Sequence, residues 1–269
     1  MPRLFAFTFA CALAMLLLAG PARAQSPDGG RPGVVVLHGK NTGPADKNLQ
    51  EAVRRLQNVG FLVSVPELPW SRRRGFDANY EQSLVEIGLA VAELRDKGVG
   101  RVALVGHGLG ANAALAYIAT RGGIFAFVAL APAHDPDRHR DVFIADLRKA
   151  REMTASGRGS ERSLFTDFSL GRDYDLSTTA EVYLSYNDPD GAAVMPRMAE
   201  LVREPLPVFW VVGTHDPLMR LGRSYAYDKL PRGPRSDFRE VEAEHQGVPR
   251  AAAVAVAEWL RDVALSGQK

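Results

Sequence analysis

The feature that most constrains the fold is a buried strand that turns through closely spaced glycines into a helix. Residues 102–105 are all apolar, glycines occupy positions 106, 108 and 110, and an alanine-rich stretch follows at 111–116. An unbroken apolar run is typical of a strand covered on both faces, as in parallel sheets, and alanine favours a helix. We therefore expect helices packed on a parallel sheet.

Two kinds of ligand-binding turn have this outline. In one, Gly-x-Ser-x-Gly, a strained turn raises a serine above the sheet. In the other, Gly-x-Gly-x-x-Gly or Ala, glycines let a pyrophosphate approach a helix N-terminus. Gly106, Gly108 and Ala111 match the second pattern. Gly106, Gly108 and Gly110 match the first, except that Gly108 stands where the serine belongs.

The rest of the chain alternates between strand and helix signals. Apolar strand segments without hairpin signals between them predict an α/β fold with a doubly wound, mostly parallel sheet. One segment, residues 133–204, is too long for a plain connection. Because it holds a helical stretch at about 141–155 and scattered aromatic residues, we predict a helical lid inserted into one domain of residues 33–269.

The first residues predict export. Arg3 precedes an apolar run at residues 4–19, and Ala22 and Ala24 form a small-x-small cleavage site, which is typical of a secretory signal peptide at 1–24. A short polar linker at 25–32 follows. We therefore expect a periplasmic or secreted protein with no membrane association after cleavage. Because the single cysteine, Cys11, is removed with this peptide, cysteine catalysis and thiolate metal sites are excluded.

Charge gives no indication of a nucleic-acid partner. The chain has 33 basic and 31 acidic residues, and the signal peptide contains two of the basic ones, Arg3 and Arg23. The mature chain therefore carries no net positive charge to attract a polyanion.

Polar residues after later strands distinguish between the serine-type turn and the dinucleotide-binding turn. A serine-type turn requires an acid after a later strand and a histidine after the last one, and Asp216 and His245 stand in those places. A dinucleotide turn belongs after the first strand, with an acidic residue about 20 positions further on. Here the turn follows the third strand, and the segment between the turn and Asp135 contains no carboxylate.

With these motifs, the chain from about residue 34 to 263 resembles the α/β-hydrolase superfamily, in particular its esterase and acyl-hydrolase branches. The resemblance implies acyl transfer on a small acyl or ester ligand, without a cofactor or metal. Asp216 would orient His245, the general base, and the backbone amides of Lys40 and Leu109 would bind the oxyanion. Gly108 occupies the nucleophile position.

Gly108 departs from the superfamily at the reacting atom. Glycine cannot form an acyl-enzyme, and losing the serine of a better-known hydrolase lowers turnover by roughly 10⁶. We therefore predict a hydrolase-like pseudoenzyme, inactive or much weakened. A non-catalytic periplasmic small-molecule binding protein that uses the old acyl pocket is one alternative. An NAD-binding oxidoreductase is a weaker one. Gly108 itself could be natural, a recent lesion or a deliberate knock-out.

Two further clusters of polar residues could bind a ligand. The first consists of Arg72, Arg73 and Arg74. They follow a strand whose carboxyl end faces the predicted site, so they either form a solvated loop or contact a substrate carboxylate or phosphate. A second cluster is metal-like in composition but has no recognised zinc spacing, so we interpret it as a polar loop; it contains His134, Asp135, Asp137 and His139.

Overall fold

A computed structural model of the chain describes residues 30–266. The predicted signal peptide at 1–24 lies outside the described residues. The centre of the molecule is a six-stranded sheet with the order β2-β1-β3-β4-β7-β8, in which every neighbouring pair is parallel. Its strands are β1 (Gly33–Leu37), β2 (Leu62–Ser64), β3 (Val102–His107), β4 (Phe127–Leu130), β7 (Val208–Gly213) and β8 (Asp237–Val241).

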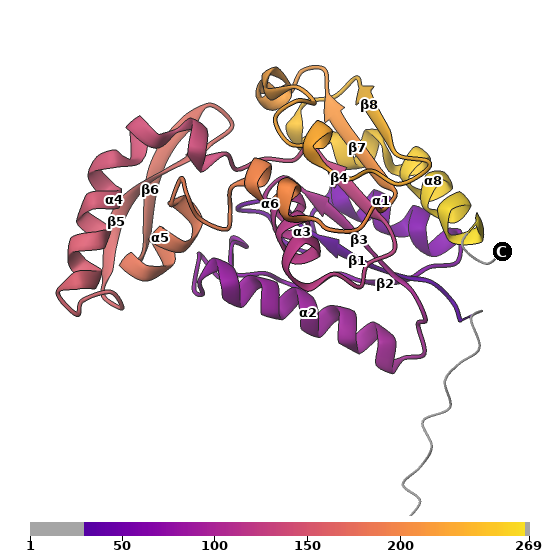
Figure 1. Cartoon of the computed structure of the whole chain (residues 1–269), viewed down its shortest axis with the longest axis horizontal. Helices are drawn as coiled ribbons and strands as arrows, with labels where there is room; N and C mark the ends of the chain where they lie inside the picture. Colours follow the sequence, from indigo (N-terminus) through magenta and orange to yellow (C-terminus); the bar gives the residue numbers. More distant parts are fainter. Residues whose placement is uncertain (1–29, 267–269) are drawn as a thin grey trace, which may run out of the picture.

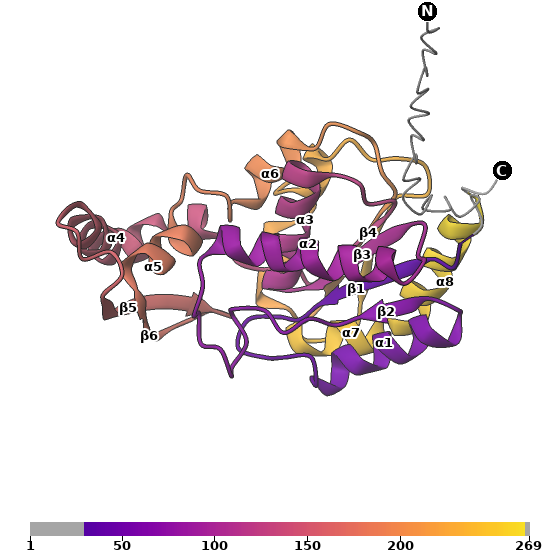
Figure 2. The same cartoon turned by 90° about the horizontal axis from the view of Figure 1, so that it is seen from below.

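Helices cover both faces of this sheet (Figures 1 and 2). Alternate side chains of a strand point to opposite faces, so Val34 and Val36 of β1 pack in one core cluster and Val35 and Leu37 in the other. One face carries α1 (Lys47–Asn58), α7 (Val248–Ala251) and α8 (Ala253–Ser266), and the other carries α2 (Tyr80–Asp96), α3 (Leu109–Arg121) and α6 (Met195–Leu201). The predicted doubly wound parallel sheet is confirmed.

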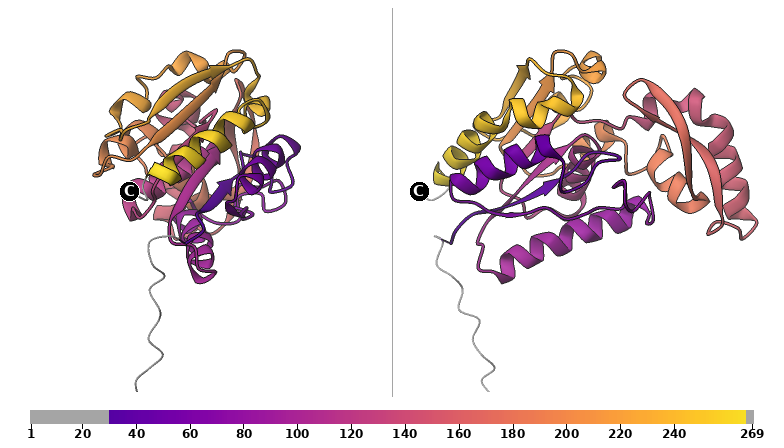
Figure 3. Two further views of the ribbon diagram at one scale, coloured as in Figure 1. Left: turned by 90° about the vertical axis from the view of Figure 1, so that its right-hand side faces the viewer. Right: turned by 180° about the vertical axis from the view of Figure 1, so that it is seen from behind.

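Between β4 and β7 the chain forms an extra lobe, which we call the insertion (residues 136–187). Figure 1 and the right-hand view of Figure 3 show it to one side of the sheet and its helices. It consists of a 3-10 turn at Pro136–Arg138, α4 (Arg140–Ala155), the strands β5 (Arg162–Ser169) and β6 (Arg172–Thr179), and α5 (Ala180–Asn187). No helix within residues 30–266 combines the length and the apolar character needed to cross a membrane.

The insertion is not purely helical, which corrects the prediction of a helical lid. β5 and β6 form an antiparallel hairpin joined by Leu170 and Gly171, both at positive φ. Two consecutive residues at positive φ are typical of a tight hairpin turn, which usually has the sequence Asn-Gly or Asp-Gly. Because leucine takes the first position here, the sequence did not indicate a hairpin. The strands are also rich in polar residues, and on β5 only Phe165 and Asp167 are buried.

Candidate active site

The glycine turn between β3 and α3 has the geometry of a nucleophile elbow, the serine-bearing turn described above. β3 ends at His107, α3 begins at Leu109, and Gly108 between them has φ 54° and ψ −120°. This is a conformation that residues with a side chain rarely adopt. Gly106 and Gly110 are needed for a different reason: a Cβ on Gly106 would overlap the Gly110 carbonyl, and a Cβ on Gly110 would lie 2.5 Å from the Leu37 carbonyl oxygen.

At Gly108 a side chain would make one tight contact, and that contact is with another side chain. A Cβ built there would lie 3.2 Å from His245 Nε2 and 3.7 Å from the Gly39 Cα atom. A side chain at this position would therefore begin next to the imidazole. The two flanking glycines are enclosed by backbone atoms, whereas a side chain at the central one would require His245 to shift by a few tenths of an ångström.

The acid and the base predicted from the sequence are in contact. Asp216 follows β7 and His245 follows β8, and the Asp216 Oδ2 atom lies 2.8 Å from His245 Nδ1. Both side chains are buried. Because a carboxylate only accepts, we assign the proton to Nδ1, which leaves the Nε2 lone pair facing Gly108. Leu218 N donates to the other carboxylate oxygen and fixes the rotation of Asp216.

His107 supports this pair from beneath the turn. Its Nε2–H donates to the His245 carbonyl oxygen at 3.1 Å, and its ring centroid lies 4.9 Å from that of His245. Complete burial, followed by the proximity of His245, lowers the pKa of His107 to about 3. His107 is therefore neutral at physiological pH and holds the backbone of the base without adding charge.

A second loop brings backbone amides to the same place. His38, buried after β1, donates from Nδ1 to the Gly39 carbonyl, and its Nε2 accepts from Leu68 N. Burial lowers the pKa of His38, in keeping with this neutral form. Among residues 30–266, no acceptor contacts the amides of Lys40 or Leu109. These are the two donors expected to bind an oxyanion, and they remain predictions.

A small cavity lies in front of His245. The space in it that admits the centres of water-sized atoms is about 30 Å³, and the cavity is partly open to solvent. Lys40 and Leu109 line it from the sheet side, and the remaining wall comes mostly from the loop after β4 and from the insertion, including Asp135, His139, Phe143, Phe168 and Ser169. The insertion therefore supplies part of the wall around the base.

A buried ion pair joins the loop after β1, which contains Lys40, to the insertion. Lys40 Nζ lies 2.9 Å from both carboxylate oxygens of Asp167 and donates to the Phe168 carbonyl oxygen at 3.1 Å. Asp167 is 1% exposed and also accepts from the Tyr174 hydroxyl. Although burial opposes ionisation of Asp167, Lys40 and the hydrogen bonds keep its pKa below the usual value. This partner could not be predicted from the sequence, because Asp167 belongs to no motif and is 127 positions from Lys40.

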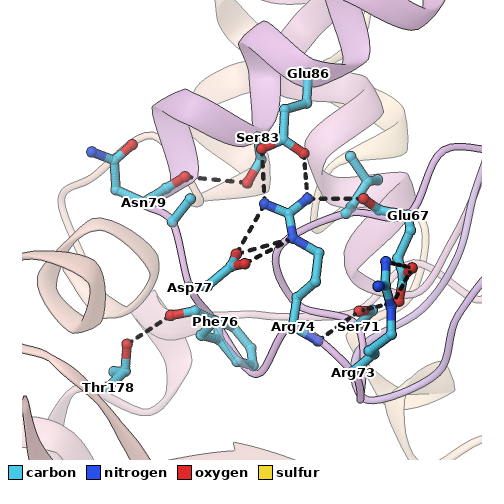
Figure 4. Close-up of polar contacts among 12 residues, drawn as sticks. Glu67, Ser71, Arg73, Arg74, Phe76, Asp77, Asn79, Ser83, Glu86 and Thr178 are labelled. Carbon is cyan, nitrogen blue, oxygen red and sulfur yellow. Dashed lines mark hydrogen bonds and ion pairs between the residues drawn. The ribbon is translucent and has the colours of Figure 1, made fainter.

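Arginines 72–74 lie away from the cavity, and Figure 4 shows how two of them are held. Arg74 forms ion pairs with Glu86 and Asp77, and Arg73 forms one with Glu67. These carboxylates occupy the guanidinium groups that would otherwise bind a substrate anion. A substrate contact by Arg72 stays a prediction.

The cluster that looked metal-like is divided among different partners. His134 Nε2–H donates to the Tyr186 carbonyl at 2.7 Å, and Asp137 accepts from the Tyr225 hydroxyl at 2.6 Å. Within the described part of the chain, no group of three or more potential ligands is arranged to hold a metal ion. Only Asp135 and His139 remain near each other, in the wall of the cavity.

Comparison with solved structures defines the class of fold. DcsB in complex with its substrate analogue superposes with a TM-score of 0.66 at 16% identity, covering 89% of this chain and 91% of that one. The monoacylglycerol lipase of Paleococcus ferrophilus gives 0.63 at 22% identity (87% and 96% covered). Est1E from Butyrivibrio proteoclasticus gives 0.58 at 16% identity (88% and 88% covered).

These likenesses, together with the parallel sheet, show that the chain has the α/β-hydrolase fold. No protein-family model and no curated protein sequence matches the chain. At such low identity the comparison establishes the fold alone. What the chain does must be argued from its own residues.

Proposed function

We propose that this protein is an esterase-like member of the α/β-hydrolase fold whose serine route is absent, and which retains at most slow hydrolysis of a bound carboxylic ester. The observation that carries the proposal is the Asp216–His245 contact of 2.8 Å, with Nε2 facing the vacant side-chain direction of Gly108. An acid–base pair oriented toward an elbow is the arrangement that ester hydrolysis requires.

The missing side chain leaves a place for a water molecule. A water molecule that occupies the side-chain position of Gly108 would lie close enough to His245 Nε2 to donate a hydrogen bond to it. His245 would take a proton from the water as its oxygen adds to the ester carbonyl, Asp216 would stabilise the imidazolium, and the amides of Lys40 and Leu109 would bind the oxyanion. The imidazolium would then give its proton to the departing alkoxide, which releases the alcohol and the carboxylic acid. No covalent intermediate forms in this route, so we expect it to be much slower than serine hydrolysis.

The test is to restore the nucleophile. Gly108→Ser and the unchanged protein are assayed on short-chain aryl esters, with His245→Ala in both backgrounds. His215→Ala is the matched control, because this histidine is close in sequence to Asp216 but exposed. We expect a large gain in kcat for Gly108→Ser, abolished by His245→Ala and unaffected by His215→Ala. A Gly108→Ser protein that folds and binds the ester but gains no activity would refute the proposal.

Binding without turnover is the second candidate function. It is favoured by the small cavity and by the buried Lys40–Asp167 ion pair that closes one side of it. A saturable ester ligand that raises the Tm without being hydrolysed, in both the original protein and Gly108→Ser, would support this reading. Stabilisation by NAD alone would instead support the oxidoreductase reading.

We also propose that the chain is exported after removal of residues 1–24. The support is the apolar run at 4–19 followed by the small-x-small site ending at Ala24. Expression with a C-terminal tag, fractionation and N-terminal sequencing test it. The expected mature N-terminus is Gln25, in the periplasm or the medium; an uncleaved chain in the cytoplasm would contradict it.

A further inference from the structure

One residue of the cavity wall has a backbone conformation that its residue type disfavours. Leu170 is the first of the two residues that join β5 to β6, and its φ is 52°; Gly171 follows with φ 86°. The left-handed conformation is strained for a residue with a branched apolar side chain, whereas glycine, asparagine and aspartate adopt it readily. The hairpin would therefore be more stable with asparagine at position 170.

Packing in the core does not account for leucine at this position. Among residues 30–266, Leu170 belongs to neither of the two buried hydrophobic clusters, nor to the half-buried residues that pack against them. Its side chain is half-buried in the wall of the cavity that contains His245. Residues held in disfavoured conformations are frequent at functional sites, and this one lies in the candidate active site.

Contacts at the end of the hairpin hold Leu170 beside the cavity. Lys40 Nζ donates to the Asp167 carboxylate and to the Phe168 carbonyl oxygen. The His139 ring lies against the Phe168 ring, with centroids 4.0 Å apart. Because these contacts fall two and three residues before the turn, they fix its position relative to the loop after β1.

Leu170 extends an apolar part of the cavity wall. Other apolar side chains reach the same cavity from separate parts of the chain: Leu109 of α3, Phe143 of α4 and Leu218 after β7. Polar side chains, His245 among them, line other parts of it. Apolar ligand atoms that leave water for such a surface gain free energy in proportion to the area they bury.

We infer that Leu170 is a specificity-determining residue, and that the ligand of this site is a carboxylic ester with an apolar chain of several carbon atoms that contacts it. The assignment of the ester rests on the proposed function; the apolar contact of Leu170 does not. Leucine here makes the hairpin less stable and adds an apolar contact for the ligand, and asparagine would do the reverse.

Binding of amides to the unaltered protein tests the contact, since amides are hydrolysed far more slowly than esters. Calorimetric titrations compare acetanilide with hexananilide, which vary the acyl part, and N-ethylacetamide with N-hexylacetamide, which vary the part that corresponds to the alcohol. Each pair differs by four methylene groups. We expect the longer member of at least one pair to bind at least about tenfold more tightly, which corresponds to burial of about two of these groups.

Substitutions on the hairpin assign this preference to one side chain. Leu170→Asn should lower the preference at least about threefold. Leu164→Asn is the matched control, because Leu164 is a leucine of the same hairpin that is 59% exposed and lies outside the cavity wall, and it should leave the preference unchanged. Equal or undetectable binding of the longer members in both pairs, or an unchanged preference in Leu170→Asn, would overturn the inference.

Thermal unfolding distinguishes a ligand contact from a structural role of Leu170. Leu170→Asn should raise the Tm by about 2–4 °C, because it removes the backbone strain. Leu170→Ala keeps a strained Cβ atom but lacks the rest of the side chain, so it should lower the chain preference without raising the Tm. A lower Tm in Leu170→Asn would show that leucine stabilises the hairpin and would overturn the inference.

Hydrolysis by Gly108→Ser separates this inference from the proposed function. The substrates are 4-nitrophenyl acetate and hexanoate, and ethyl and hexyl acetate. We expect kcat/KM to favour the longer ester of at least one pair about tenfold, and adding Leu170→Asn to lower this ratio. Hydrolysis without a chain preference in either pair would reject the role of Leu170 and leave the esterase proposal standing. Chain-selective binding of the amides without hydrolysis of any ester would support the role of Leu170 and reject the esterase proposal.

Discussion

Replacing Gly108 with serine tests the stability of the turn as well as its chemistry. The backbone at φ 54° and ψ −120° costs a residue with a side chain about 1–3 kcal/mol. A serine hydroxyl bonded to His245 Nε2 would return about 0.5–1.5 kcal/mol. We therefore expect Gly108→Ser to lower the free energy of unfolding by about 1 kcal/mol, which in a chain of this size lowers the Tm by about 2–4 °C.

Two controls separate backbone strain from the hydrogen bond. Gly108→Ala adds the strain and the Cβ atom 3.2 Å from His245 Nε2, but no hydroxyl. Gly122→Ser adds the same residue at φ 64° and ψ −154° after α3, where a Cβ would meet no atom within 4 Å. Gly108→Ser should therefore be more stable than Gly108→Ala by the hydrogen-bond contribution. Gly122→Ser should show the strain alone.

Urea unfolding at neutral pH, followed by circular dichroism, measures these differences. Parallel transitions with unchanged slopes would show that only stability has changed. If Gly108→Ser were less stable than Gly108→Ala, the hydroxyl would not be bonded to the imidazole, and the orientation assigned to His245 would be wrong. A loss far beyond about 3 kcal/mol would show that the turn has no room for a side chain.

Three other measurements follow from the structure. Lys40→Met should destabilise the fold by about 3–5 kcal/mol because it leaves the Asp167 carboxylate buried and unpaired. Adding Asp167→Asn should recover part of this loss in the same unfolding assay, and an additive loss in the double variant would contradict the pairing. Burial lowers the pKa of His107 and of His134 to about 3 from 6.5, so between these two pH values the unfolded chain binds more protons than the folded chain. The free energy of unfolding should therefore fall by up to about 1.4 kcal/mol per pH unit for each histidine as the pH drops below 6.5. A urea midpoint that does not change between pH 7 and 5 would contradict this. The sequence, rather than the cavity lining, predicts that Arg72→Ala weakens anionic ligands but not neutral ones in calorimetric titrations, and equal effects on both would remove this arginine from the site.

Sequence patterns were sufficient for the sheet and the acid–base pair. The unbroken apolar runs at β1, β3 and β4 predict parallel strands because such strands are buried on both faces. Asp216 and His245 follow strands whose carboxyl ends share one edge of the sheet, so their placement follows from the topology. The contact between them could be expected before any coordinates.

The insertion could not be predicted in the same way. Its strands are polar, its turn begins with leucine, and Asp167 acquires its role only when the hairpin comes next to Lys40. Asp135 and His139 were noticed from their residue types, but their shared place in a cavity depends on the fold of the whole lobe. Long-range contacts of isolated polar residues leave no periodic signal in a sequence.

The three glycines of the turn have unequal freedom to change. Gly106 and Gly110 are fixed by backbone atoms that any larger residue would strike, whereas the nearest atom to a side chain at Gly108 would be Nε2 of the His245 imidazole, itself part of a side chain. A single evolutionary step at position 108 could therefore switch the chemistry on or off while the scaffold stays intact. Under the proposed function, a lineage with glycine at position 108 would keep the acid–base pair and its scaffold in place, and one substitution would be enough to restore the nucleophile.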